Sequence, residues 1–203
     1  MAVSELERDA LVEAFNIGIG AAAASFSEMV GEEVLLNLPT LEVVQAKAVA
    51  TMALEQSSVC GVNQEFRSSF GAGKAIVFFP EARSLELVRV LMGEALDEGE
   101  EMAELEQEAL TEVGNVVLNA CLAGLSNLIG EEFDVTLPNF RRCTAGELVV
   151  EADEPDDEEV VVLLKIRFDL KHRALDGHLA FLLSVGSLQS LASRLLEKLG
   201  LSA

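Results

Sequence analysis

One spaced motif occurs twice in this chain, and it constrains the fold more than any other feature of the sequence. Each copy has a glutamate, an asparagine three residues later and a proline after a further gap of 22 residues. The copies are Glu13, Asn16 and Pro39, and then Glu112, Asn115 and Pro138. Each member of the second copy follows its counterpart by 99 residues, and twelve of the 31 positions from 9 to 39 are identical in the second copy. A repeat of fixed period predicts two similar structural units.

Both copies begin in a segment with the pattern of a long helix. Ser4 and Glu7 have the spacing of a capping box, which predicts a helix that runs to about Val30 and stops at Gly31. The second half predicts a helix over about residues 103–129 that stops at Gly130. Strands are expected at about 41–53, 58–70, 73–79, 140–151, 158–169 and 176–184, with tight turns at 71–73 and 174–177. A last helix is expected in each half, capped by Ser84 and Ser187.

These elements predict an α/β fold made of two fused, pseudo-twofold repeats. The turns between strands are short, which favours hairpins and therefore a largely antiparallel sheet with the long helices packed on it. The whole chain, 1–203, is expected to form a single domain from repeats of about 1–95 and 96–203. The acidic run at 94–101 is the expected boundary, and a second acidic run at 151–159 is an expected loop.

The composition excludes several classes of function. The net charge is −21, with 35 acidic against 14 basic residues, so nucleic acids and anionic membranes would be repelled. A partner with a basic surface is the natural complement. Three cysteines without a C-x-x-C pair indicate free thiols of a reducing compartment, and with only two histidines a zinc site is not expected. No signal peptide or long uncharged span is evident, so we expect a cytoplasmic protein.

The repeated polar residues fall on one stripe of each helix. Positions i, i+4 and i+7 share a helix face, which aligns Asp9, Glu13 and Asn16 in the first half. Glu108, Glu112 and Asn115 align in the same way in the second half. A solvated helix face would explain the glutamates. It explains the asparagines less well, because Asn is a poor residue for a helix interior and yet occurs twice at the same place. A functional stripe and a solvated face both remain open at this point.

Glutamate and asparagine alone can perform only limited chemistry. Neither is a strong nucleophile, so a covalent intermediate on this chain is not expected. A carboxamide has two donors and an acceptor, enough to hold and aim a water molecule, as a glutamine does in GTPases. Such a residue needs a substrate that carries its own electrophile and metal. A nearby glutamate could dock that substrate through a lysine.

The doubled motif resembles the pattern of the CheC/CheX/FliY family of chemotaxis phosphatases. That family is characterised by an Asp or Ser, then Glu four residues later, Asn three residues after it, and Pro after a gap of 22 residues. Both copies match this spacing, and Gly114 directly before Asn115 also matches. The resemblance extends over essentially the whole chain. Two complete sites, on a chain that ends directly after its last helix, resemble the CheC branch, since CheX keeps one site and FliY adds a rotor-binding domain.

The resemblance implies a phosphatase for the aspartyl phosphate of the response regulator CheY. Asn16 and Asn115 would each position the attacking water, and Glu13 and Glu112 would contact a lysine of the regulator. The chain would need no cofactor of its own, because Mg²⁺ is expected on the regulator. We call Glu13 with Asn16 the first site and Glu112 with Asn115 the second site. The second ranks higher in this interpretation, because Phe15 could obstruct Asn16 or could pack inward.

Two other roles are compatible with the same resemblance. The chain could be a binding module that sequesters phosphorylated CheY or the receptor deamidase CheD with little turnover. A structural role in the flagellar switch is a third possibility. Pro39 and Pro138 are expected to be structural, because proline ends or interrupts strands. The repeated glutamates at 32, 33, 131 and 132 are expected to be polar strand entries.

Overall fold

The computed structural model describes residues 3–49, 58–92, 100–149, 159–170 and 173–201. Most of the expected boundary at 94–101 and of the acidic loop at 151–159 lies outside these ranges, as does the end of the strand expected at 41–53.

A single seven-stranded sheet forms the centre of the molecule. Its strands, listed in chain order, are β1 (Val34–Gln45), β2 (Ser58–Ser68), β3 (Gly71–Pro80), β4 (Asp134–Val135), β5 (Asn139–Thr144), β6 (Glu159–Leu170) and β7 (Arg173–Ser184). Their spatial order is β1-β6-β7-β3-β2-β4, and β5 also pairs with β2. All of these pairs are antiparallel, which confirms the predicted antiparallel sheet with helices.

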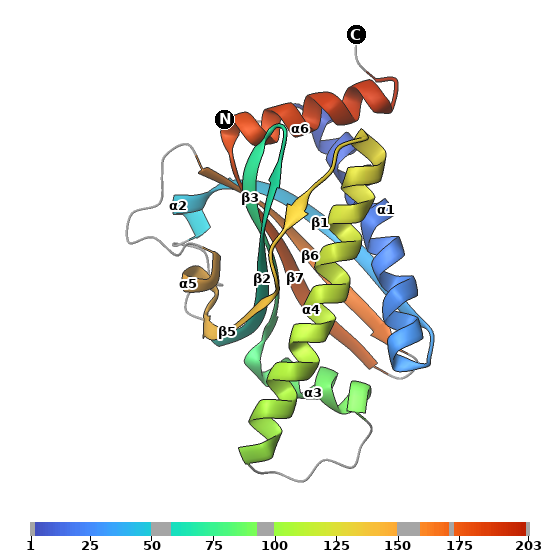
Figure 1. Cartoon of the computed structure of the whole chain (residues 1–203), viewed down its shortest axis with the longest axis vertical. Helices are drawn as coiled ribbons and strands as arrows, with labels where there is room; N and C mark the ends of the chain where they lie inside the picture. The colour runs from blue at the N-terminus through green and yellow to red at the C-terminus, as the bar shows by residue number, and fades with distance from the viewer. Residues whose placement is uncertain (1–2, 50–57, 93–99, 150–158, 171–172, 202–203) are drawn as a thin grey trace.

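Six helices surround the sheet in the described part of the chain. They are α1 (Glu5–Val30), α2 (Ala46–Val49), α3 (Glu81–Met92), α4 (Glu100–Ile129), α5 (Ala145–Val149) and α6 (Val185–Lys198). The two long helices, α1 and α4, lie side by side across one face, with α3 and α6 at their ends (Figure 1). The short helices α2 and α5 cover part of the opposite face.

Alternation along the strands divides the apolar residues between the two faces, as the period of two in a strand requires. On β6, Val160, Val162 and Leu164 belong to the large core under the long helices. Val161 and Leu163, which point the other way, belong to a smaller cluster under α2 and α5. The sheet is therefore buried on both faces at its centre, and the long helices rest on its more extensively covered side.

The two long helices run antiparallel and approach each other closely at glycines. A Cβ atom added to Gly18 would lie 2.8 Å from the Cα of Cys121, and one added to Gly124 would lie 2.7 Å from the Cα of Gly18. Real Cβ atoms do not approach so closely. Glycine at these positions is what allows the backbones of α1 and α4 to come together, and this contact fixes where each helix presents its outer face.

Both predicted ends of α1 and the predicted end of α4 at Gly130 are confirmed. The Ser4 side chain accepts a hydrogen bond from the Glu7 N–H and the Glu7 carboxylate accepts one from the Ser4 N–H, which is a capping box. Gly31 and Gly130 follow α1 and α4 with φ of 71° and 73°, in the left-handed region that favours glycine at a helix end. Helix α4 begins at Glu100, earlier than expected.

Several local predictions were wrong. Residues 46–49 and 145–149 form the short helices α2 and α5 and do not extend the preceding strands. The hairpin turn between β2 and β3 is at 69–70, and the expected turn residues 71–73 and 174–177 are paired within β3 and β7. Ser84 and Ser187 lie inside helices that begin at Glu81 and Val185.

Neither Ser84 nor Ser187 caps its helix, and each makes another hydrogen bond. Ser84 is buried, and its hydroxyl donates to the carboxylate of Glu106 at 2.6 Å. The cap of α6 is Ser184, whose hydroxyl accepts a hydrogen bond from the backbone N–H of Ser187. Both serines are therefore close to a helix start but are not its first residue.

The strand order is symmetric between the two halves. Read from one edge of the sheet, it matches the order read from the other edge when each strand is replaced by its counterpart in the other half. Strand β1 is at one edge beside β6, and β5 is on the other side of the sheet beside β2, while β3 and β7 meet in the middle. Two related repeats would produce this arrangement. The rotation that relates them stays a prediction.

By length and composition, two helical segments could span a membrane. They are α1 and residues Glu104–Ile129 of α4. In the most apolar 18-residue stretch of each segment, 44% and 50% of the residues are buried inside the fold. Their buried residues form the main core with the sheet, as in core helices of globular domains. Length and composition alone are therefore weak evidence for a membrane span.

Candidate active site

The first site lies on the outer side of α1. Ala14 and Phe15 are fully buried in the core, whereas Glu13 and Asn16 are exposed, as is Asp9 one turn earlier. This pattern is the one that a stripe at i, i+4 and i+7 predicts. The carboxylates and the carboxamide of the first site can therefore be reached from solvent.

The second site lies on the outer side of α4. Glu108 and Glu112 are exposed, and Asn115 is half-buried between the buried Gly114 and the half-buried Val116. The side chain of Asn115 is held by a neighbour one turn further on, because the Asn119 amide nitrogen donates to the Asn115 amide oxygen at 2.7 Å. The second carboxamide is thus partly exposed and already hydrogen-bonded.

The residue before each asparagine is explained by packing. Phe15 is 1% exposed, and its ring centroid is 4.8 Å from that of Phe181 in β7, so it points into the core. Of the two alternatives left open by the sequence, it packs inward and does not cover Asn16. Gly114 is required for another reason: an added Cβ would lie 2.4 Å from the Cβ of Val62, where α4 rests on β2. The difference between Phe15 and Gly114 therefore gives no reason to rank the second site above the first.

The structure keeps the two sites separate. The helices approach each other closely at Gly18 of α1, two residues beyond Asn16, and at Cys121 and Gly124 of α4, six and nine residues beyond Asn115. Because the helices are antiparallel, this contact places the two asparagines at different levels along the helix pair. Each helix therefore carries its own site.

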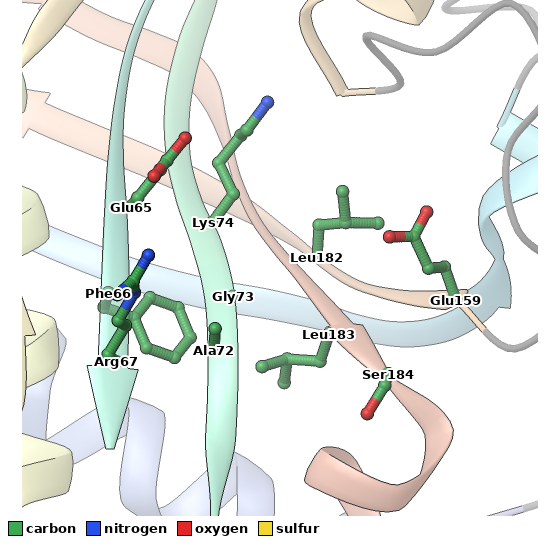
Figure 2. Close-up of a pocket in the computed structure, with 10 residues that line it drawn as sticks. All are labelled: Glu65, Phe66, Arg67, Ala72, Gly73, Lys74, Glu159, Leu182, Leu183 and Ser184. Atoms are coloured by element: carbon green, nitrogen blue, oxygen red, sulfur yellow. The ribbon is translucent and has the colours of Figure 1, made fainter.

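Two hollows of the described surface lie away from both sites. One hollow, of about 380 Å³, lies at one end of β2, β3 and β7. Its lining includes Glu65, Arg67 and Lys74 (Figure 2). A second, of about 410 Å³, is lined by polar residues of β1, β6 and β7. Neither includes a residue of the doubled motif. The candidate sites are therefore exposed helix faces, which suit a macromolecular partner better than a small molecule bound in a pocket.

The two buried thiols, Cys60 and Cys121, are poorly suited to act as nucleophiles. All three cysteines are free, as the sequence predicted. Burial raises the pKa of Cys121, under the helix crossing, to about 12. Burial also raises the pKa of Cys60, which lies beside Glu106. A thiol with a raised pKa carries little of the reactive thiolate at neutral pH. Among the described residues, no three His, Cys, Asp or Glu side chains gather as a metal-binding group.

Other repeated residues have structural surroundings. The register between β1 and β6 shifts between Asn37 and Thr40, where Pro39 interrupts the ladder, and Pro138 directly precedes β5. Glu131 forms an ion pair with Arg194 of α6. Hydrogen bonds from Ser69 and Arg194 lower the pKa of Glu131. This glutamate therefore connects the end of α4 to the last helix.

Sequence reasoning missed Asn119. It is at the position that aligns with Gly20 in the first half, so the repeat itself does not select it. The available signal was its spacing of four residues from Asn115, which places the two side chains on the same helix face.

Comparisons with known proteins agree with the resemblance to the CheC/CheX/FliY family. No family model matches the chain. A protein from Halobacterium salinarum named putative CheY-P phosphatase CheC1 is 22% identical over 176 residues, which cover 87% of this chain and 83% of that protein. The flagellar motor switch phosphatase FliY of Bacillus subtilis is 22% identical over 83% of this chain, but the match spans only 43% of that longer protein.

Solved structures share the fold. The crystal structure of Thermotoga maritima FliY matches with a TM-score of 0.74 and 18% identity, covering 98% of this chain and 100% of that one. CheX in a complex with CheY, BeF₃ and Mg²⁺ from Borrelia burgdorferi matches with a TM-score of 0.53 and 20% identity, covering 84% of this chain and 96% of that one. Together with the doubled motif and the two relatives, these matches make the chain similar in sequence and in fold to members of the CheC/FliY family.

Proposed function

We propose that this protein accelerates hydrolysis of the aspartyl phosphate on a CheY-type response regulator. One observation carries the proposal. Each of the two long helices presents a carboxamide and a glutamate, one turn apart, on an outer face that solvent reaches. The CheY-P phosphatase named among the relatives supports the choice of substrate.

The chemistry proposed for each site is positioning of water. Asn16 or Asn115 would hold a water molecule in line with the phosphorus–oxygen bond of the aspartyl phosphate. Holding reactants in the right geometry can remove a large share of a barrier without any nucleophile from this chain. This agrees with the raised pKa of the Cys121 thiol, which leaves that group protonated. The phosphoryl group would leave the aspartate and join the water oxygen, releasing inorganic phosphate.

Glu13 and Glu112 are proposed to dock the regulator. Both carboxylates are exposed and lie three residues before their asparagines, on the same side of the helix. An ion pair with a lysine of the regulator would bring the carboxamide to the phosphoryl group. The net charge of −21 also favours a partner with a basic surface. The complex of a CheX with CheY supports such a pairing in this fold.

No cofactor is proposed for this chain. Mg²⁺ is expected on the regulator, where it would neutralise charge on the phosphoryl oxygens. The residues described above would then only bind the regulator and orient water. We also propose a cytoplasmic location, where a phosphorylated response regulator would be found.

The test is phosphate release from a phosphorylated receiver domain, with and without the protein. The double variant Asn16→Ala with Asn115→Ala should lose at least about 10²-fold in kcat, because neither helix can then orient water. Binding of the phosphorylated receiver should persist, since Glu13 and Glu112 remain. Turnover equal to that of the unmodified protein would show that the carboxamide mechanism is wrong.

The same experiment distinguishes the alternative of a binding module. A protein that sequesters phosphorylated CheY would form a saturable complex without any change in phosphate release. A protein that acts through the deamidase CheD would bind that enzyme in a pull-down and show no effect on the receiver. Either result would replace the phosphatase proposal.

A further inference from the structure

The two candidate sites differ in one feature that the motif does not contain. In the second site, the amide nitrogen of Asn119 donates to the amide oxygen of Asn115 at 2.7 Å. In the first site, the aligned position is Gly20, which has no side chain to donate. Among the described residues, none donates a side-chain hydrogen bond to Asn16.

This hydrogen bond restricts Asn115 without exhausting its capacity. An amide oxygen has two lone pairs and the amide nitrogen has two protons. One lone pair of Asn115 is used by Asn119, so the other lone pair and both protons remain for a water molecule. The side chain gives up rotamer freedom before a partner arrives, and that freedom need not be lost when the complex forms.

We propose that Asn119 is a positioning residue that holds the carboxamide of Asn115 in one orientation, so that the second site is preorganised and the first is not. The inference rests on the proposed function, because preorganisation is useful only if Asn115 aims water. Asn119 acts through Asn115 and is not assigned a contact with the phosphoryl group. The expected consequence is a faster chemical step at the second site at equal docking.

The alternative explanation is a surface hydrogen bond that only supports the helix. Amide pairs at i and i+4 do stabilise isolated helices slightly. This explanation predicts an effect on stability and none on turnover. Because alanine is a better helix former than asparagine, Asn119→Ala should leave the fold intact, so the two explanations can be separated.

The chain offers a matched exchange between its two sites. A Cβ added to Gly20 meets nothing within 4 Å, so Gly20→Asn can introduce the missing carboxamide without a clash. Gly20→Ala is the control, since it gives the same helix a side chain without the amide. Asn16→Ala and Asn115→Ala supply parents that keep only the second or only the first site.

The readout is kcat and KM for phosphate release from a phosphorylated receiver domain. In the Asn16→Ala parent, adding Asn119→Ala should lower kcat about three- to tenfold, the size expected for one neutral hydrogen bond, with KM unchanged. In the Asn115→Ala parent, Gly20→Asn should raise kcat above that of Gly20→Ala. Equal kcat within either pair would overturn the proposal.

A second measurement does not depend on activity. The side-chain amide of Asn115 should give restricted NMR relaxation in the unmodified protein and become as mobile as that of Asn16 in Asn119→Ala. Unchanged mobility would overturn the positioning role. If the Asn16→Ala parent releases no phosphate above background while the NMR result is as expected, the proposed function fails and the hydrogen-bonded restraint of Asn115 stands.

Discussion

His178 is a titratable residue placed where protonation is unfavourable. It lies on β7, half-buried, with its ring stacked on Phe78 at 5.0 Å between centroids and 14° between planes. Burial lowers the pKa of His178, the positive charge of Lys165 lowers it further, and Asp176 partly opposes them. Its Nδ1 atom has no hydrogen-bond partner in the described structure. The neutral imidazole is therefore the form that the fold accommodates.

We predict that His178 makes the protein less stable as the pH falls below about 6.5. A histidine with a lowered folded-state pKa takes up its proton more readily when the chain unfolds, so stability is full above the unfolded pKa and declines as the pH falls from there toward the folded pKa. Urea unfolding of the unmodified protein and of His178→Phe, between pH 7.5 and 5, measures this effect. The variant should show a smaller decline over this window, and an equal decline in both proteins would contradict the assignment.

The sequence predicts the exposure of a site residue where the helix period alone determines which face the residue occupies. The exposure of Glu13, Asn16 and Glu112 follows from their spacing. The direction of Phe15 could not be predicted, because it depends on Phe181, which is 166 residues further along the chain and meets it only in the folded sheet. A local sequence pattern carries no information about contacts with residues so far along the chain.

At the scale of elements, the α1–α4 crossing is the contact that positions both sites. It depends on the absence of a side chain at Gly18, whose added Cβ would lie 2.8 Å from the backbone of Cys121. Backbone cannot move aside as the end of a flexible side chain can. Any separation of the two helices would also shift the faces that carry Asn16 and Asn115.

We predict that Gly18→Ala lowers the free energy of unfolding by about 1–3 kcal/mol, the usual cost of overpacking. Gly20→Ala, two residues away on the same helix, has open space around its new Cβ and should raise stability by about 0.5–1 kcal/mol. Chemical denaturation of both variants measures the contrast. If both substitutions stabilise the protein, α1 and α4 do not meet at Gly18 as closely as described.

Long elements were predictable and short ones were not. The capping box and the glycine stops located α1 within a residue or two, because these signals lie in the element itself. Residues 46–49 continue the apolar pattern of β1, and a short apolar run does not distinguish a strand from one turn of helix. The hairpin turn lies at 69–70, but the sequence predicted it at the neighbouring glycines, residues 71–73. Glycine is the strongest turn signal, but it can also lie within a strand.

At the scale of the whole molecule, the two halves of the sequence are interleaved in the sheet. Among the strands of the described ranges, only the hairpins β2–β3 and β6–β7 pair within a half. The pairs β1–β6, β2–β5 and β3–β7 each join one half to the other. The repeat could be predicted from spacing alone, but this interleaving could not, because it depends on contacts between residues about a hundred positions apart.

A polar cluster also joins the halves. Glu106 of α4 is buried, accepts a hydrogen bond from Ser84 of α3 at 2.6 Å and forms an ion pair with Arg142 of β5. Arg142 reaches Glu81, at the start of α3, at 3.5 Å. Removing Glu106 would leave the Ser84 hydroxyl buried without this partner, which costs free energy.

We predict from this interleaving that the described ranges of the chain unfold as one unit. Cys60 lies in the first half and Cys121 in the second, and both are fully buried, so thiol labelling in urea reports on each half separately. Single-cysteine variants should become reactive at the same urea concentration, because neither half keeps its edge strands without the other. Glu106→Ala should lower the free energy of unfolding by about 1–3 kcal/mol and therefore lower both urea midpoints together. Midpoints that separate, or a shift confined to Cys60, would mean that the two repeats are stable independently and only rest against each other.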